Sequence, residues 1–145
     1  MDRKRNFEFL EHTADVYIVA YGKNLAEVFE NAATAMFEVM TEVDQIEAEV
    51  EDYIEVNAED EYALLYSWLE ELLVKSDIDN MLYCKFTISE LEKRKEGFRL
   101  KAKIWGEEFN PKKHPQKVGV KAITYHRMEI IDKPEKTVAK FILDI

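Results

Sequence analysis

A polar pentad near the start of the chain, residues 11–15, carries an acid and a histidine three residues apart, Asp15 and His12. The stretches on either side, residues 7–10 and 16–21, are rich in β-branched and aromatic side chains, which favours strands. A carboxylate at a strand junction can accept hydrogen bonds from backbone amides and still face solvent, so this pair is a candidate site. The structural alternative is that Asp15 caps a turn and His12 is ordinary polar surface.

Nucleophilic chemistry has little support in the sequence. A small hydrolase would pair Asp15 with His12 or His126, but no serine lies near these histidines and no glycine-rich phosphate loop is present. Cys84 is the single cysteine, so no intrachain disulfide can form, and its apolar neighbours favour a core position over a nucleophile. The residues therefore give little support to a small hydrolase.

The composition predicts one domain with an acidic surface. The chain has 145 residues, enough for a single domain, residues 1–145, with a real core. Its formal net charge of -10 disfavours stand-alone binding of nucleic acid, because phosphate repels it, and suits a basic partner or a cation. No apolar run approaches the roughly 18 residues of a membrane span, and no apolar stretch follows the basic N-terminus as in a signal peptide. We expect a cytoplasmic protein with no membrane partner.

Two helices are predicted from apolar stripes with helical spacing. The first begins after Asn24, a good N-cap with Glu27 three residues on, and the second begins after Asn57 and ends at a loop over residues 77–80. The first stripe contains Leu25, Val28, Phe29, Ala32, Ala33, Met36 and Phe37, and the second contains Leu64, Leu65, Trp68, Leu69, Leu72 and Leu73. Both stripes are typical of helices that pack on a core.

The remaining regular segments alternate apolar and polar side chains, as strands with one solvated face do. They cover residues 46–56, 81–92, 98–104, 117–126, 127–131 and 137–145, with a hairpin tip over residues 93–97. This order of elements predicts an α+β fold, in which two amphipathic helices pack on one face of a mostly antiparallel sheet. A pair of partly separate sheets is the main alternative.

Several separated motifs together resemble those of the archease family. They are residues 9–15, 21–22, 29–33, 69–73, the strongest motif Val120-Lys121-Ala122-Ile123-Thr124-Tyr125-His126, and residues 141–145. The resemblance covers almost the whole chain, and the order and spacing of the motifs make it specific.

The resemblance implies a small cytoplasmic accessory protein that is not itself an enzyme. Archeases assist the GTP-dependent RNA ligase that joins tRNA halves after intron removal, by promoting ligase guanylation and multiple turnover. The ligase is thus the expected partner, and tRNA is reached indirectly through it. An alternative for the family is a chaperone-like modulator of a tRNA methyltransferase.

A divalent-cation site is also implied by the resemblance. Its acidic residues match Asp15 and Asp144, with the terminal carboxylate of Ile145 close by. Three hard oxygen donors of like charge suit Ca²⁺, the favoured ion, or Mg²⁺ or Mn²⁺, better than Zn²⁺. His12 could join as a softer ligand. The structural alternative is that residues 144–145 form a frayed terminus.

Partner-facing roles are expected for four further residues. A basic residue needed for activation in the family matches Lys121, and we group His12, Tyr125 and His126 with it. Direct contact with RNA is a weaker hypothesis. It relies on a basic loop and strand containing Lys112, Lys113, His114, Lys117 and Lys121, for which an ordinary solvated loop is the alternative.

Overall fold

The structure is a computed structural model that describes residues 6–10 and 15–145. Two helices, α1 (Leu25–Met40) and α2 (Glu61–Asp79), and a short 3₁₀ helix, η1 (Val43–Gln45), accompany seven strands within this part of the chain. The strands are β1 (Phe7–Leu10), β2 (Asp15–Gly22), β3 (Val50–Ala58), β4 (Met81–Arg94), β5 (Gly97–Glu108), β6 (Ala122–Asp132) and β7 (Thr137–Asp144).

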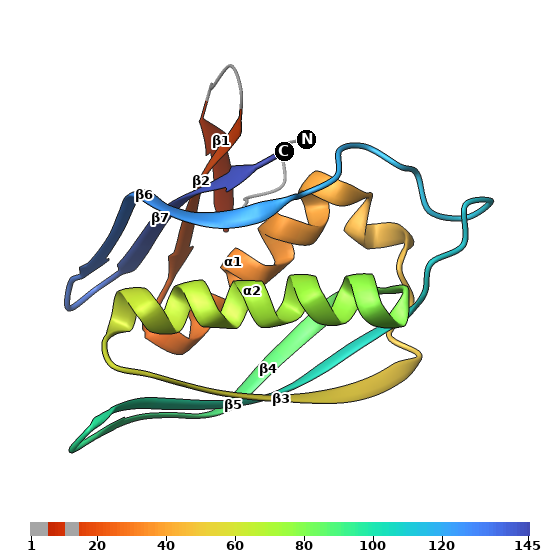
Figure 1. The fold of residues 1–145 in the computed structure, drawn as a ribbon. Helices are drawn as coiled ribbons and strands as arrows, with labels where there is room; N and C mark the ends of the chain where they lie inside the picture. The colour runs from red at the N-terminus through yellow and green to blue at the C-terminus, as the bar shows by residue number, and fades with distance from the viewer. Residues whose placement is uncertain (1–5, 11–14) are drawn as a thin grey trace.

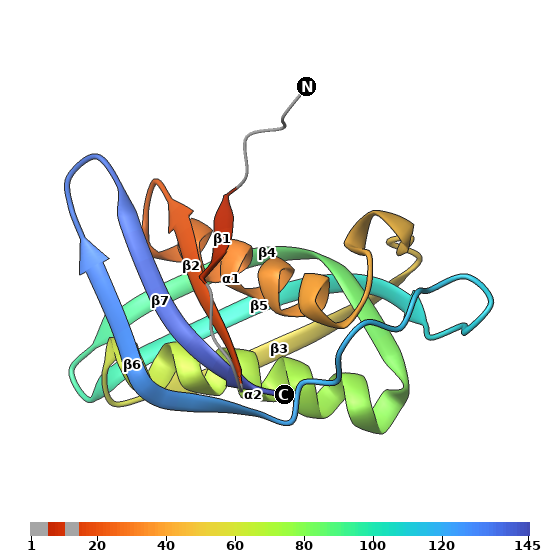
Figure 2. The same ribbon diagram turned by 90° about the horizontal axis from the view of Figure 1, so that it is seen from above.

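The strands form two antiparallel sheets with both helices between them (Figure 1). One sheet has the order β1-β2-β7-β6 and the other the order β3-β5-β4. Helix α1 packs on β2 and β4, whereas α2 packs on β6 and β3, so each helix contacts both sheets. The predicted α+β class is confirmed, and the two sheets are separate layers rather than one continuous sheet. Figure 2, seen from above, shows both helices lying beneath the strands of the first sheet.

Helix α1 forms where its stripe and its cap predict. The Asn24 side chain accepts a hydrogen bond from the Glu27 amide (2.9 Å), and the Glu27 carboxylate accepts one from the Lys23 amide (3.1 Å). Every predicted apolar position except Leu25 is buried. The indole of Trp68 on α2 donates to the Phe29 carbonyl (2.9 Å), which joins the two helices inside the core.

Helix α2 differs from its prediction at both ends. Its N-cap is Asp60, whose side chain accepts from the Ala63 amide (2.8 Å), because Asn57 continues β3 opposite Arg99. The predicted loop over residues 77–80 is wrong, since the helix runs on to Asp79 and closes at Asn80 in the left-handed conformation (φ 54°). Neither helix among the described residues is long and apolar enough to cross a bilayer.

The strand predicted over residues 117–126 begins five residues later. The amides of Lys117 and Val118 instead donate to the carbonyls of Met40 and Val39 (3.1 and 3.3 Å), which are otherwise unsatisfied at the end of α1. Strand β6 then starts at Ala122 and runs to Asp132, so it includes residues 127–131, which were predicted as a separate strand. Likewise β3 starts at Val50, after an irregular stretch over residues 46–49.

Strand β6 contains a large bulge. Thr124 pairs with Ile142 and Glu129 pairs with Lys140, so residues 125–128 stand against a single residue of β7. Within the bulge Arg127 adopts a left-handed conformation (φ 57°), which is uncommon for a non-glycine residue. Residues 125–127 are exposed as a result, while Met128 turns into the core.

Candidate functional site

Asp15 and Asp144 lie directly opposite each other at the paired ends of β2 and β7. Opposed residues of an antiparallel pair project from the same face, with Cβ atoms about 5 Å apart. The next pair along, Val16 and Leu143, packs into the core, so the two aspartates project from the other face of the sheet. Asp144 is exposed and Asp15 is half-buried. Two carboxylates 129 positions apart in sequence are thus neighbours in the fold.

The end of β7 is held on both sides. Asp144 pairs with Asp15 of β2 and with Ala122 of β6, and its carbonyl accepts a hydrogen bond from the Lys121 amide (2.8 Å). Ile145 packs partly buried against the core. The frayed-terminus alternative is therefore wrong, and Lys121 lies beside Asp144 and is exposed. His12 belongs to residues 11–14, outside the described part of the chain.

The donor chemistry at this edge fits a hard cation. Like charges placed directly opposite each other across two strands destabilise the pair, and a bound cation would relieve this repulsion. Asp15 and Asp144 offer carboxylate oxygens, and Ile145 would add its terminal carboxylate. No group of three or more His, Cys, Asp or Glu side chains suited to a metal occurs among residues 6–10 and 15–145.

A hollow of about 490 Å³ opens beside Asp15. Its walls are mainly apolar and include Phe9, Leu10 and Val118, each about two-fifths exposed. Glu38 and Lys117 complete the lining, and they pair with each other (2.8 Å). Four separate segments build this hollow, so no local sequence pattern signals it.

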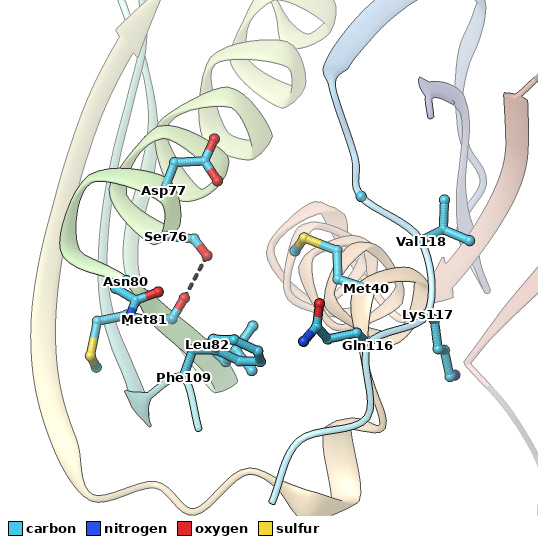
Figure 3. Close-up of a pocket in the computed structure, with 11 residues that line it drawn as sticks. Met40, Ser76, Asp77, Asn80, Met81, Leu82, Phe109, Gln116, Lys117 and Val118 are labelled. Atoms are coloured by element: carbon cyan, nitrogen blue, oxygen red, sulfur yellow. Dashed lines mark hydrogen bonds between the residues drawn. The ribbon is translucent and has the colours of Figure 1, made fainter. Parts of the chain in front are cut away.

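A second pocket, of about 350 Å³, lies between the C-terminal ends of the two helices (Figure 3). Figure 3 shows Met40 and Gln116 on one side of it, facing Ser76 and Asp77 on the other. The Ser76 hydroxyl donates to the Met81 carbonyl (2.5 Å), which fixes the turn after α2. Neither Asp15 nor Asp144 lines this pocket, although it shares Lys117 and Val118 with the hollow beside Asp15.

The other predicted partner residues sit in the β6 bulge. Tyr125 and His126 are both exposed, and Tyr125 stacks on Tyr66 of α2. Tyr125 follows Ala122, the residue opposite Asp144, by three positions, or about 10 Å along a strand. These residues are therefore close to the aspartate pair but do not form part of it.

The basic loop is mostly neutralised from within the protein. Lys113 pairs with Glu107 (2.8 Å) and Glu47 (3.2 Å), and His114 is buried with its Nε2 2.9 Å from Glu107. Burial alone raises the pKa of Glu107, but hydrogen bonds from Lys113, the Glu47 amide and His114 outweigh it and lower that pKa to about 2. The expectation of an ordinary solvated loop is wrong for His114, which is buried, whereas Lys112, Lys117 and Lys121 are exposed.

Two potential nucleophiles are unsuited to catalysis. Cys84 is half-buried against the core, and burial raises the pKa of its thiol, which keeps it protonated. The Nδ1 atom of His114 accepts a hydrogen bond from the Asn110 amide (2.9 Å), so neither ring nitrogen is open to a substrate. Both side chains have structural roles.

Comparison with known proteins identifies the family. The profile of the archease protein family matches residues 7–145. Protein archease of Sulfolobus acidocaldarius is 47% identical over 140 residues, which cover 96% of this chain and 98% of that protein. The solution structure of protein 1598 of Methanobacterium thermoautotrophicum is 43% identical, covers 97% of this chain and 99% of its own, and superimposes with a TM-score of 0.84.

A more distant structure shares the fold alone. It is the crystal structure of an archease from Thermotoga maritima, described as a possible chaperone, with 16% identity and a TM-score of 0.63 over 100% of this chain and 98% of its own. The match over residues 7–145 and the near-complete coverage of close relatives agree with each other. This chain belongs to the archease family.

Proposed function

We propose that this protein is a non-enzymatic activator of the GTP-dependent tRNA-splicing RNA ligase, which promotes ligase guanylation and multiple turnover. The observation that carries the proposal is the direct opposition of Asp15 and Asp144 at the ends of two paired strands. Such an arrangement of like charges is costly for the fold alone. It becomes useful if the pair holds a cation that the ligase reaction requires.

Asp15 and Asp144 would bind a divalent cation, Ca²⁺ first and Mg²⁺ or Mn²⁺ as alternatives, together with the terminal carboxylate of Ile145. A bound cation supplies positive charge that can neutralise a phosphate of GTP. The aspartates would hold that ion at the ends of β2 and β7, where a partner can approach it. Lys121, exposed at the same edge, offers a second positive group.

Electrostatics favour a basic protein partner. The chain carries a net charge of -10, and a ligase that binds tRNA must present positive charge to the phosphates. Opposite charges steer two proteins together and raise the rate of encounter. The same net charge, and the internal pairing of Lys113 and His114, disfavour direct capture of RNA by this protein.

The test is a guanylation assay with ligase, radiolabelled GTP and Mn²⁺, with and without this protein. We expect the wild-type protein to raise the amount of guanylated ligase, and Asp15→Asn to remove at least nine-tenths of that effect. Glu129→Gln, which removes an exposed carboxylate elsewhere on the same sheet, serves as the matched control. Normal stimulation by Asp15→Asn would contradict the proposal. If no protein variant changed guanylation but tRNA methylation by a methyltransferase rose, the chaperone-like alternative would replace it.

Lys121→Ala separates two roles for the lysine. A lysine that only balances the aspartates leaves, when removed, a more negative site with equal or tighter Ca²⁺ binding. A lysine that contacts the ligase complex leaves Ca²⁺ affinity nearly unchanged and still reduces guanylation. We expect the second outcome, measured by calorimetric Ca²⁺ titration beside the guanylation assay. Full stimulation by Lys121→Ala would rule out both roles.

A further inference from the structure

The outer side of α2 carries apolar side chains that the fold does not bury. Figure 1 shows α2 along one side of the molecule, between β6 and β3. Tyr62 and Val74 are each 41% exposed, and Ile78 is 76% exposed. With Tyr66 and Glu70 these residues recur every four positions, so they form a stripe that winds around the helix by about 40° per step, and only neighbouring members share a face.

An aromatic pair stands at the N-terminal half of this stripe. The rings of Tyr66 and Tyr125 are parallel within 7°, with centroids 4.4 Å apart. Tyr125 is nevertheless 54% exposed, so the face of its ring that does not contact Tyr66 is open to solvent. The β6 bulge presents it there, with Arg127 in a conformation that costs of order 1 kcal/mol or more. Bulges are common next to functional sites, where they redirect a side chain.

Three carboxylates lie near enough to Tyr125 to act on it electrostatically. Burial raises the pKa of Tyr125, and the negative charges of Asp60, Glu59 and Glu70 raise it further. Among the described residues no lysine or arginine pairs with any of these three carboxylates. An open ring face with carboxylates near it matches one ligand chemistry best, a flat cation.

We propose that Tyr125 and its acidic surround form a docking site for an arginine side chain of a partner protein. A guanidinium group stacks on a tyrosine ring and donates several hydrogen bonds to carboxylates, which a lysine ammonium cannot do in the same geometry. Nucleobases also stack on tyrosine, but the carboxylates would repel the attached phosphates.

This inference rests on the proposed function for the identity of the partner. An RNA ligase carries arginines for binding phosphate, and these are the groups that the site around Tyr125 would accept. The docking chemistry itself can be tested without the ligase.

The first experiment titrates the full-length protein with three probes, a twelve-residue peptide of alternating Arg and Gly, the matching Lys and Gly peptide, and a twelve-nucleotide single-stranded RNA. We expect the arginine peptide to bind at least fivefold more tightly than either other probe. Tyr125→Ala should weaken that binding at least tenfold, Tyr125→Phe by less than twofold, and Tyr53→Ala not at all. Tyr53 is the matched control, because it is also 54% exposed but lies on β3. Equal binding of both peptides, preference for RNA, or no dependence on Tyr125 would each overturn the inference.

The second experiment measures binding of the same variants to the ligase by fluorescence anisotropy, beside guanylation. Tyr125→Ala should weaken ligase binding at least tenfold, whereas Asp15→Asn should bind normally and fail to stimulate. Stimulation by the wild type with normal binding of Tyr125→Ala would refute the arginine site and leave the proposed function standing. Arginine-selective binding through Tyr125 without stimulation of guanylation would support the arginine site and refute the proposed function. Urea unfolding of each variant confirms that the fold is retained.

Discussion

This protein holds carboxylates in two opposite settings, one at Glu107 and the other at the pair Asp15 and Asp144. Glu107 has a side chain that is 11% exposed and accepts hydrogen bonds from Lys113, His114 and the Glu47 amide. Asp15 and Asp144 are opposed like charges at the paired ends of β2 and β7 in the other sheet. The Glu107 cluster supplies its own positive charge, whereas the aspartate pair brings two negative charges together at the ends of paired strands.

The contrast separates stability from function within one acidic chain. A buried carboxylate with a full set of donors stabilises the folded state, and removing it leaves those donors unsatisfied. Opposed carboxylates at a surface do little for stability and can even reduce it. Substitutions at the two places should therefore affect different measurements.

The largest effect is expected at the internal cluster. In Glu107→Gln the new amide N–H₂ meets the ammonium of Lys113 and the N–H of His114, so at least one donor loses its acceptor. We expect the free energy of unfolding to fall by about 2–4 kcal/mol. Urea unfolding measures it, with guanylation of the ligase unchanged at a temperature where the variant is folded. A loss below about 0.5 kcal/mol would show that the cluster does not anchor the loop.

The same cluster predicts an acid dependence. The pKa of Glu107 is lowered from 4.5 to about 2 in the folded protein. A lowered pKa stabilises the fold fully above the unfolded value, and this stabilisation is lost as pH falls from about 4.5 toward about 2. The loss reaches about 3 kcal/mol at most. Unfolding curves across this range should differ between wild type and Glu107→Gln, and parallel curves would contradict the assignment.

A smaller effect is expected where the loop covers the end of α1. The Lys117 ammonium donates to the Glu38 carbonyl (2.9 Å) and pairs with the Glu38 and Glu42 carboxylates. Lys117→Met keeps the apolar stem and removes the charge near the helix C-terminus, so we expect a loss of about 0.5–1 kcal/mol. Lys112→Met, in the exposed part of the same loop, is the control and should change unfolding by less.

The smallest effect, and one of opposite sign, is expected at the aspartate pair. Asp144→Asn removes one of two opposed charges, so without divalent cation the free energy of unfolding should rise by about 0.2–1 kcal/mol. Unfolding in the presence of a chelator measures this. A loss of more than about 1 kcal/mol would mean that Asp144 is a structural residue like Glu107.

Local sequence determined those parts of the fold whose partners are nearby. The stripe and the Asn24 cap of α1 lie within one segment, so both were predictable. Asn57 and Asp60 are equally good caps by type, and only the pairing of Asn57 with Arg99, far along the chain, decides between them. Alternation over residues 117–121 suggested a strand, but their amides are used by the end of α1 instead.

The candidate site shows the same division. No local pattern indicates that Asp15 pairs with Asp144, since the register of β2 and β7 depends on the whole sheet; the resemblance to archeases suggested it. The burial of His114 depends on Glu107 from β5, and the Tyr125 stack depends on α2. These contacts join segments that are distant in sequence, and the periodicity of one segment carries no information about its contacts with another.

The most direct test of the central claim is a calorimetric titration of the metal-free protein with Ca²⁺, for wild type, Asp144→Asn and Glu129→Gln. We predict one site in the wild type and in Glu129→Gln, and at least tenfold weaker binding in Asp144→Asn. Equal Ca²⁺ binding by wild type and Asp144→Asn, or no binding by the wild type, would contradict the claim that the opposed aspartates form a cation site.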